Sequence, residues 1–408
     1  MQKMNDRTPN FRHLRVFAEV ARRGSISMAA DRIHLSQPAI SQALAKLEEN
    51  FGVKLFERRS DGMTPTEHGV LALARVERAL ELVEGGAREA ARLSVRKGAR
   101  AFANFEQLLT TPQLRALAAV SGARNFSLAA RDAGVAQPTL HRAARDLERL
   151  SGIPLFIKSA AGIDLTASAK ALAQAVKLAF AELNQAFDEI DAALGLAQGE
   201  IVIGAMPLPR THLLPAAINA LTRERPEVRL RVVEGPYNDL LHGLRHGDID
   251  LLVGALRHPP PIDDITQETL FVDPLAVVGR AGHPLADKPA VSVEELASYP
   301  WAAPRDGTPT RDYFNKMFNG LTITGGLVET SSLVLIRGML LGSDRLTLIS
   351  AHQISHEREI GLLVPLAVDT SGGSRPIGIT CRRDWKPTPV QQLFLDHLRA
   401  AGKLAERG

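Results

Sequence analysis

Glutamine and serine side chains at Gln37, Ser41 and Gln42 recur at a spacing that places them on the exposed face of a predicted helix. A glutamine amide can form two hydrogen bonds with adenine, and a serine hydroxyl can donate or accept. Arg58 and Arg59 follow in a predicted turn and have the charge that suits phosphate or minor-groove contact. These residue types predict contact with double-stranded nucleic acid; the alternative is that Gln37 only caps its helix.

A second group of candidate residues lies in the C-terminal half, at predicted strand ends and helix starts. Free backbone N–H groups at a helix start favour an anion, and Arg305 or Arg311 could add a bidentate contact to a carboxylate. The alternative is that the serines and threonines only cap helices. The residues predicted to contact a small polar or anionic ligand are Met206, Pro207, Leu208, Arg305, Thr308, Ser331 and Ser332.

The sequence contains none of the common catalytic or metal-binding motifs. A Walker loop, an HExxH motif, a GxSxG motif and zinc-type spacing are all missing. Cys381 lies in an apolar predicted strand, where a small core residue is more common than a nucleophile. His352 and His356 are four residues apart, but the acidic residues nearby are ordinary surface charges. We therefore expect no catalytic residues, no metal and no cofactor.

The basic charge of the 408-residue chain is concentrated at its N-terminal end. Residues 1–100 contain 18 Lys and Arg against 12 Asp and Glu, whereas the remaining 308 residues are close to neutral. Binding to phosphates needs such a local excess. No long apolar run predicts a membrane span, and the N-terminus has no apolar core typical of a signal peptide. With the single cysteine, this pattern predicts a cytoplasmic protein.

The elements that must position the first group follow from helix signals. Apolar residues at helical spacing predict a helix that Gly24-Ser25 ends. Ser27 is the predicted N-cap of a short helix over residues 28–34. Ser36 and Pro38 begin the helix that holds Gln37, and Gly52 stops it. Residues 53–56 then predict a strand, residues 58–62 a basic turn and residues 63–65 a returning strand.

This whole unit occurs twice, at an offset of one hundred residues and without an insertion. An internal repeat of this kind predicts two copies of one structural module. The matching residues include Leu14-Arg15 with Leu114-Arg115, Ala29-Ala30 with Ala129-Ala130, Gln37-Pro38 with Gln137-Pro138, Leu47-Glu48 with Leu147-Glu148, Leu55-Phe56 with Leu155-Phe156, and Gly52, Gly62 and Thr66 with Gly152, Gly162 and Thr166.

The segment from Phe11 to Gly69 resembles the LysR-type transcriptional regulators. The resemblance rests on Ala29-Ala30, on the run from Leu35 to Ser41, on Leu55-Phe56-Glu57-Arg58, and on Thr64 to Gly69. It implies a winged helix-turn-helix with one helix in the major groove and a wing against the DNA backbone. On this basis the predicted DNA-binding residues are Ser27, Ser36, Gln37, Pro38, Ser41, Gln42, Arg58 and Arg59.

The second copy departs from this pattern. Its predicted recognition segment, residues 135–141, has lost the capping serine, and His141-Arg142 replaces Ser41-Gln42. The segment Lys158-Ser159-Ala160-Ala161 retains one basic residue where the first copy has two arginines. A copy kept for packing or dimerisation and a second DNA reader are both compatible with this sequence.

After Gly199, short apolar strands alternate with helices, which predicts a parallel α/β sheet. Segments including residues 226–228, 247–251, 283–285 and 383–398 resemble the second half of LysR-type regulators, which implies two Rossmann-like lobes with a ligand cleft, like periplasmic binding proteins. The predicted organisation is a winged helix-turn-helix domain at 9–68, a helical linker at 69–97, a degenerate repeat at 104–165, a long linker or dimerisation helix at 166–197, and a ligand-binding domain at 198–408, with lobe I at 198–267 and 370–408 and lobe II at 268–369.

The fold class is therefore multidomain, with two winged helix-turn-helix modules ahead of an α/β two-lobed domain. The most favoured function is a regulator that binds operator DNA as a homo-oligomer, dimer or tetramer, and responds to a small-molecule effector. One alternative is a small-molecule-binding protein whose modules serve assembly. Another is an enzyme on the C-terminal lobes.

Overall fold

The fold was analysed in a computed structural model, which describes residues 8–60, 62–95, 101–102, 104–123, 125–159, 162–196 and 199–406. The chain divides into two compact units, Met1–Glu200 with Arg245–Asp248, and Ile201–Leu244 with Ile249–Gly408. Among the described helices, none has the length and apolar character needed to cross a membrane.

The first module is a three-helix unit with a two-stranded wing. Gly24 and Gly52 end the first and third helices in the left-handed conformation (φ 65° and 73°), as the sequence predicts. In the wing, β1 pairs with β2 in antiparallel register. The elements are α1 (Phe11–Arg23), α2 (Ile26–Ile33), α3 (Gln37–Phe51), β1 (Phe56–Arg59) and β2 (Gly62–Pro65).

Three local predictions for this module are wrong. The N-cap of α2 is Ser25, not Ser27, because Ser25 has the extended backbone and its hydroxyl accepts from the N–H of Met28. The predicted strand over residues 53–56 begins only at Phe56, since the backbone N–H of Leu55 donates to the Glu48 carboxylate instead of to a strand. Arg58 and Arg59 consequently lie in β1 and not in a turn.

The second module repeats this architecture. Its wing, β3 with β4, has the same register as the first, and Gly152 ends α7 as Gly52 ends α3. Lys158 lies in β3 of this wing, and Ala160 and Ala161 are outside the described residues. The elements are η1 (Phe105–Leu108), α5 (Thr111–Ser121), α6 (Phe126–Asp132), α7 (Gln137–Ser151), β3 (Phe156–Ser159) and β4 (Gly162–Leu165).

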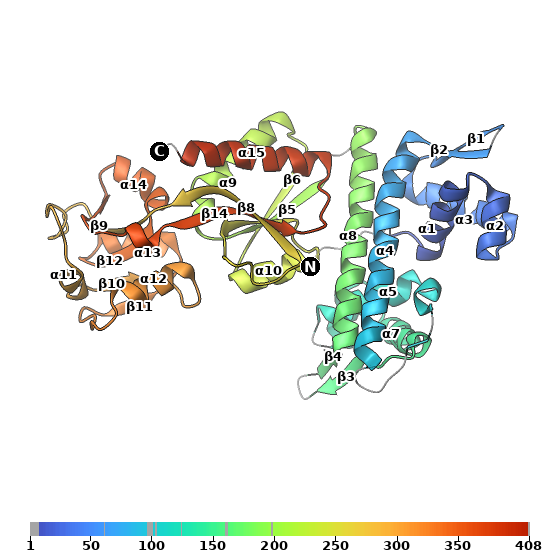
Figure 1. Cartoon of the computed structure of the whole chain (residues 1–408), viewed down its shortest axis with the longest axis horizontal. Coiled ribbons are helices and arrows are strands. Elements are labelled where there is room, and N and C mark those ends of the chain that lie inside the picture. The colour runs from blue at the N-terminus through green and yellow to red at the C-terminus, as the bar shows by residue number, and fades with distance from the viewer. Residues whose placement is uncertain are drawn as a thin grey trace. The chain divides into compact units, whose positions relative to one another are not determined.

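Each module is followed by one long helix, and the two long helices pack against each other. Both α4 (Glu67–Val95) and α8 (Ala167–Ala193) differ by a few residues from the predicted bounds. They run antiparallel, because Arg75 near the start of α4 contacts Glu189 near the end of α8, whereas Gly86 lies against Ala175. Figure 1 shows the first module beside one half of this helix pair and the second module beside the other half.

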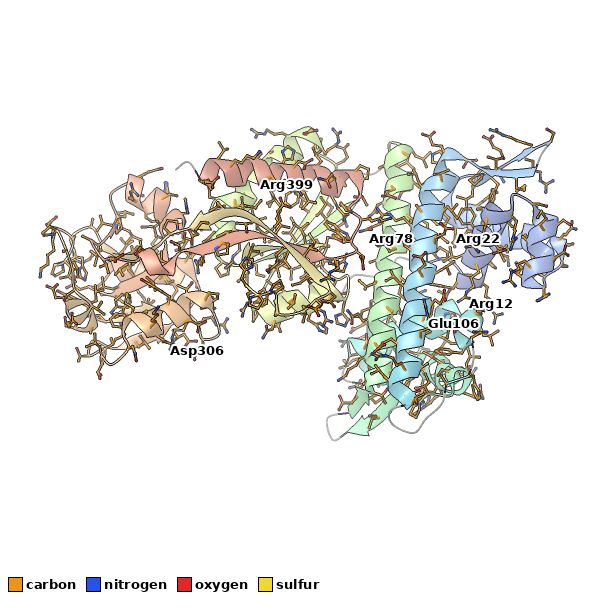
Figure 2. The ribbon with its side chains drawn as sticks, in the orientation of Figure 1. Arg12, Arg22, Arg78, Glu106, Asp306 and Arg399 are labelled. Atoms are coloured by element: carbon orange, nitrogen blue, oxygen red, sulfur yellow. The ribbon has the colours of Figure 1, made fainter. Side chains whose placement is uncertain are left out.

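The first lobe of the second unit is a five-stranded sheet that packs with helices, α15 among them. The strand order is β6-β5-β7-β14-β8. Strand β5 runs parallel to β7, as the alternating strands and helices predict, whereas the later β14 is antiparallel to β7 and β8. Figure 2 labels Arg399 on α15. Its side chain forms two hydrogen bonds with Glu268 on β8, which ties this helix to the sheet. The elements are β5 (Glu200–Ala205), η2 (Leu208–Arg210), α9 (Leu213–Glu224), β6 (Arg229–Glu234), α10 (Tyr237–Arg245), β7 (Leu251–Ala255), β8 (Ile265–Asp273), β14 (Arg375–Arg382) and α15 (Pro389–Ala405).

The second lobe has its own mixed sheet, in the order β11-β10-β12-β9-β13. Trp301 lies in its core with Phe314 and Phe318 in edge-to-face contact. The elements are β9 (Leu275–Arg280), α11 (Val293–Ala297), β10 (Trp301–Ala303), α12 (Pro309–Met317), β11 (Leu327–Glu329), α13 (Leu333–Leu341), β12 (Leu346–Ser350), η3 (Ala351–Ile354), α14 (Ser355–Glu359), β13 (Leu363–Pro365) and η4 (Ser371–Gly373).

The predicted boundary of lobe II at residue 268 is wrong. Strand β8 pairs with β14 of lobe I as far as Asp273, so the chain enters lobe II only at Pro274. It returns at Arg375, which is the register partner of Asp273. The two crossings between the lobes therefore lie side by side.

Two neighbouring glycines of α4 predict opposite effects on stability. A Cβ at Gly86 would lie 2.3 Å from the Cβ of Ala175, whereas one at Gly85 would meet nothing within 4 Å. We expect Gly86→Ala to cost about 1–3 kcal/mol through overpacking, and Gly85→Ala to stabilise by about 0.5–1 kcal/mol through helix propensity. Chemical denaturation followed by far-UV circular dichroism measures both.

Tryptophan fluorescence is an internal control for this comparison, because Trp301 and Trp385 both belong to the second unit. A shift of the circular dichroism transition without a shift of the fluorescence transition places the effect in the helical unit. Equal behaviour of the two alanine variants would contradict the close packing at Gly86.

Candidate nucleic-acid interface and ligand cleft

The start of α3 is built as the sequence predicts. Ser36 has an extended backbone, and its hydroxyl accepts from the N–H of Ala39 at 3.4 Å. Pro38 occupies the first turn of the helix, where its missing N–H leaves no bond unmade. Ile40, Leu44 and Leu47 are buried below this turn. Gln37 and Gln42 are exposed and Ser41 is partly exposed.

Ser27 and Gln37 contact each other across the two helices of the motif. The Gln37 amide donates to the Ser27 hydroxyl at 3.3 Å. The equivalent residues of the second module, Ser127 and Gln137, are also hydrogen-bonded, at 2.9 Å. Because both copies form this bond, it fixes the start of one helix to the next. The side-chain amide of Gln42, by contrast, forms no hydrogen bond within the described part of the chain.

The first wing is exposed and basic at its tip. Arg58 and Arg59 pair in register with Met63 and Gly62, and both arginines are exposed. Arg59 forms a salt bridge of 3.2 Å with Glu57, whose side chain is also exposed. An exposed pair of this kind contributes little energy, so Arg59 can exchange it for a phosphate.

The second module holds its recognition helix differently. Ala136 takes the capping position of α7 and provides no side-chain hydrogen bond. The ring of His141 packs edge-to-face on Phe126, with centroids 4.8 Å apart, whereas Arg142 is exposed. One of the two residues that replace Ser41-Gln42 is therefore engaged in packing.

The second unit contains a cleft with a cavity of about 110 Å³, lined from both lobes. Six of the seven residues predicted to contact a ligand line it, and Gln353, Thr310 and Arg375 lie with them. Arginines are the charged residues of this lining. The predicted residues in the lining are Met206, Pro207, Leu208, Arg305, Thr308 and Ser331.

Helix starts provide donors at the cleft. Thr308 is the N-cap of α12, and its hydroxyl accepts from the N–H of Arg311 at 3.2 Å. Ser331 precedes α13, and its hydroxyl forms no hydrogen bond within the residues that the structure describes. Ser332 does not line the cavity: it is the N-cap of α13 and accepts from the N–H of Leu335.

Arg311, the other predicted carboxylate clamp, is already engaged. Its guanidinium donates to the Pro304 carbonyl at 2.8 Å and to the Glu329 carboxylate at 3.0 Å, and Asp306 lies 3.3 Å away. The pKa of Glu329 is lowered by the backbone N–H of Asp306 and by Arg311. Arg311 therefore holds the loop before α12 and is not a member of the lining.

Sequence analysis missed Arg375, which the structure places in the cleft. Its side chain is largely buried, lies 3.3 Å from the carboxylate of the fully buried Asp273, and donates to the Thr310 hydroxyl. Burial raises the pKa of Asp273, against the opposing effects of Arg375 and of the Ser350 hydroxyl that donates to it. Burial disfavours the charged form of Arg375 as well, and so lowers the pKa of its guanidinium. No local sequence pattern marked Arg375, because it begins the strand by which the chain returns from lobe II to lobe I, and the pairing of that strand with β8 places it at the cleft.

Cys381 lies in β14, and burial raises the pKa of its thiol to about 12, which disfavours the reactive thiolate. The ring of His352 packs on Phe271. No group of three or more potential metal ligands occurs among the residues searched, which are those that the structure describes.

Comparison with known families agrees with this architecture. Residues 11–70 and 111–170 each match the family model for the bacterial regulatory helix-turn-helix protein, lysR family. Residues 194–403, about half of the chain, match the LysR substrate binding domain. The chain belongs to the LysR family of transcriptional regulators. Members of this family bind DNA through the helix-turn-helix, respond to small molecules through the second domain and act as oligomers.

Individual relatives differ in how much of the chain they match. The HTH-type transcriptional regulator GalR of Pseudomonas putida is 32% identical over 393 residues, which cover 96% of this chain and 97% of GalR. PcaQ of Agrobacterium fabrum is 29% identical, and its match covers 97% of PcaQ but 73% of this chain. A full-length OxyR variant from Pseudomonas aeruginosa has the same fold over 72% of this chain and 95% of its own, with a TM-score of 0.54 and 24% identity.

The sequence could not tell whether a glutamine of α3 contacts bases or stabilises the fold. The hydrogen bond between Ser27 and Gln37 gives Gln37 a structural role that Gln42 does not have. We expect Gln42→Ala to cost about 1–3 kcal/mol at the specific DNA site and little on random DNA, because the Gln42 amide is unengaged. Gln37→Ala should cost a similar amount at the specific site and also lower the melting temperature of the helical unit.

Fluorescence anisotropy with specific and random duplexes measures both affinities at one salt concentration. Gln137→Ala, which removes the equivalent bond of the second module, is the matched control. Equal losses on the two duplexes would show that neither glutamine contacts bases.

Proposed function

We propose that the cleft of the second unit binds a small anionic effector, most simply a carboxylate. The observation that supports this is the charge of the lining: Arg305 and Arg375 are its charged residues. Met206, Pro207 and Leu208 provide an apolar wall for the remainder of the ligand. A cavity of about 110 Å³ favours a small metabolite.

The position of Arg375 connects ligand binding with the two lobes. Arg375 and Asp273 lie on the paired strands where the chain passes between the lobes. A ligand carboxylate near Arg375 would compete with Asp273 for the same guanidinium. Since each lobe contributes to the lining, binding would favour one arrangement of the lobes over another.

The first module provides most of the DNA affinity in this proposal, through Ser27, Ser36, Gln37, Pro38, Ser41, Gln42, Arg58 and Arg59. Gln37, Ser41 and Gln42 contact bases, and Ser36 and Pro38 orient their helix. The bond between Ser27 and Gln37 in addition holds the preceding helix against this one. Arg58 and Arg59 contact phosphates. We further propose that the protein has no catalytic activity, in keeping with its family.

Removing the exposed arginine of the cleft should weaken the ligand response without changing DNA binding. We expect Arg305→Ala to raise the Kd of a small carboxylate about tenfold, since one charge-assisted hydrogen bond is lost. Ser331→Ala should have a smaller effect. A thermal-shift panel of small mono- and dicarboxylates with their uncharged amides identifies the probe, because a ligand that prefers the native state raises the melting temperature.

Lys316→Ala is the matched control, because Lys316 is an exposed cation on α12 that does not line the cavity. Ser332→Ala should lower stability rather than ligand affinity, since Ser332 caps α13. Tighter binding of the amides than of the carboxylates would exclude an anionic effector.

The two modules should contribute unequally to DNA binding. We expect Arg58→Ala with Arg59→Ala to weaken binding to all duplexes and to flatten its dependence on salt, because two phosphate contacts are lost. Arg142→Ala should change affinity less. Titrations at several salt concentrations give the slope for each variant. If Arg142→Ala reduces the salt dependence of DNA affinity as strongly as the double substitution at Arg58 and Arg59, both modules bind DNA.

A further inference from the structure

The two modules and their long helices are related by an internal twofold axis. Positions one hundred residues apart are equivalent in the repeat, and two such positions meet: the backbone N–H of Phe11 donates to the hydroxyl of Thr111 at 3.0 Å. Ala79 and Ala179, also equivalent, are both fully buried in the shared core of the antiparallel helices. The axis therefore passes between α1 and α5 and through the middle of the α4 and α8 pair.

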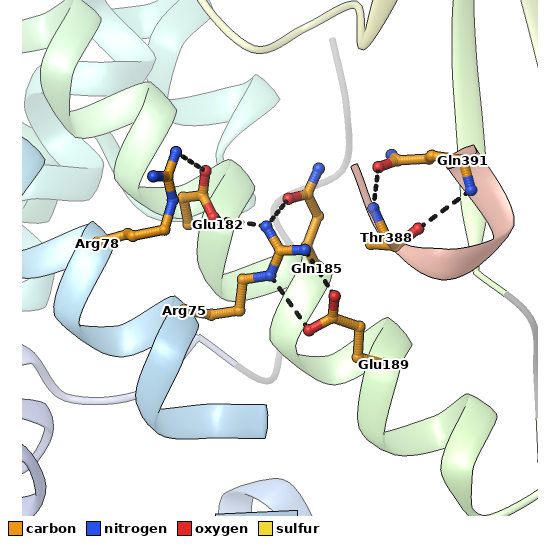
Figure 3. A network of polar contacts seen from close by, with 7 residues as sticks. All are labelled: Arg75, Arg78, Glu182, Gln185, Glu189, Thr388 and Gln391. Carbon is orange, nitrogen blue, oxygen red and sulfur yellow. Dashed lines mark hydrogen bonds and ion pairs between the residues drawn. The ribbon is translucent and has the colours of Figure 1, made fainter. Parts of the chain in front are cut away.

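The polar contacts across this axis are not symmetric. The Arg75 side chain, 6% exposed, donates to Glu182 at 2.9 Å, to Gln185 at 2.7 Å and to Glu189 at 2.6 Å (Figure 3). Arg78 contacts the other oxygen of Glu182 at 3.2 Å. Burial acts to lower the pKa of Arg75, but the hydrogen bonds to Glu189 and Glu182 outweigh it and raise this pKa.

The equivalent residues on the other side of the axis cannot repeat this cluster. The positions equivalent to Arg75 and Arg78 are occupied by Ala175 and Leu178, and those equivalent to Glu182, Gln185 and Glu189 by Leu82, Gly85 and Glu89. There the two helices are instead in close contact, with Gly86 against Ala175 and Leu172. Cations thus belong to α4 and their acceptors belong to α8.

We infer that one chain contains its own complete DNA-binding pair, and that the Arg75 cluster prevents α4 from pairing with α4 of a second copy. An α4–α4 pair would place the buried Arg75 and the partly buried Arg78 opposite Leu82, Gly85 and Glu89. Arg75 would then keep one carboxylate, but the carboxylate of Glu182, which both arginines share, would be replaced by Leu82. An α8–α8 pair would bury Glu182 and Glu189 without their cations. Leaving one partner of a buried ion pair uncompensated is strongly destabilising.

Further contacts join the first module to α8 of the same chain. Phe11 packs edge-to-face on Phe180 with centroids 5.9 Å apart, and Phe51 stacks on Phe187 at 4.5 Å. Arg15 donates to the carbonyls of Glu106 and Leu109 before α5. One chain therefore presents α3 and α7 about its internal axis, which fits DNA with two half-sites, read unequally.

Complementation within one chain and between chains tests this inference. We expect Arg75→Glu to weaken DNA binding at least tenfold and to lower the circular dichroism melting temperature of the full-length protein. Adding Glu189→Arg to the same chain should restore most of both. When Arg75→Glu and Glu189→Arg are placed on two co-expressed, differently tagged chains, neither the DNA affinity nor the melting temperature should recover. Arg88→Glu with Glu84→Arg, an exposed pair on α4, is the control and should have little effect.

A milder pair of variants tests the same inference without a buried charge. Gly86→Ala should be compensated by Ala175→Gly in the same chain but not on a second chain. Rescue between chains would show that α4 pairs with α8 of another copy, and absence of rescue within the chain for both designs would show that these contacts do not select the partner. Either result overturns the inference. The melting readout is independent of which residues contact DNA, so failure of the proposed base contacts is recognised separately.

Discussion

The close antiparallel packing of α4 and α8 is the constraint on which the helical unit depends. Small residues along both helices, including Ala72, Ala79 and Gly86 on α4, allow their backbones to approach, and Ala175 leaves no room for a larger residue at Gly86. Both modules pack their own helices against this pair and share one apolar cluster with it. A change in the spacing of the two helices would therefore displace α3 and α7 together.

Local signals in the sequence predicted most of the first module. Ser36, Pro38 and the left-handed glycines Gly24 and Gly52 act at short range, so their roles follow from neighbouring residues alone. Ser25 and Ser27 are equally good caps by type, and only the backbone conformation distinguishes them. The wing began later than predicted because Glu48, seven residues away, accepts from the backbone of Leu55.

The cleft shows where such local signals end. Strand ends and helix starts placed Met206, Thr308 and Ser331 at one cavity, since the edges of open α/β sheets bring them together. Arg375 could not be found in this way, because its partners Asp273 and Thr310 are 102 and 65 positions away in the sequence. The boundary of lobe II failed for the same reason: pairing between β8 and β14 decides it, and no short-range pattern records that pairing.

Duplication within one chain removes a restriction that symmetry imposes on oligomers. In a symmetric dimer each substitution appears on both sides of the axis, so a buried arginine on one helix is a buried arginine on its partner. Here the two sides have separate codons, and Arg75 can face Glu182 and Glu189 while Ala175 faces Gly86. The same freedom allows the first module to retain Ser41, Gln42 and a basic wing while the second packs His141 on Phe126. The unequal DNA contacts that we propose and a helix pair that selects its own partner would both follow from this one duplication.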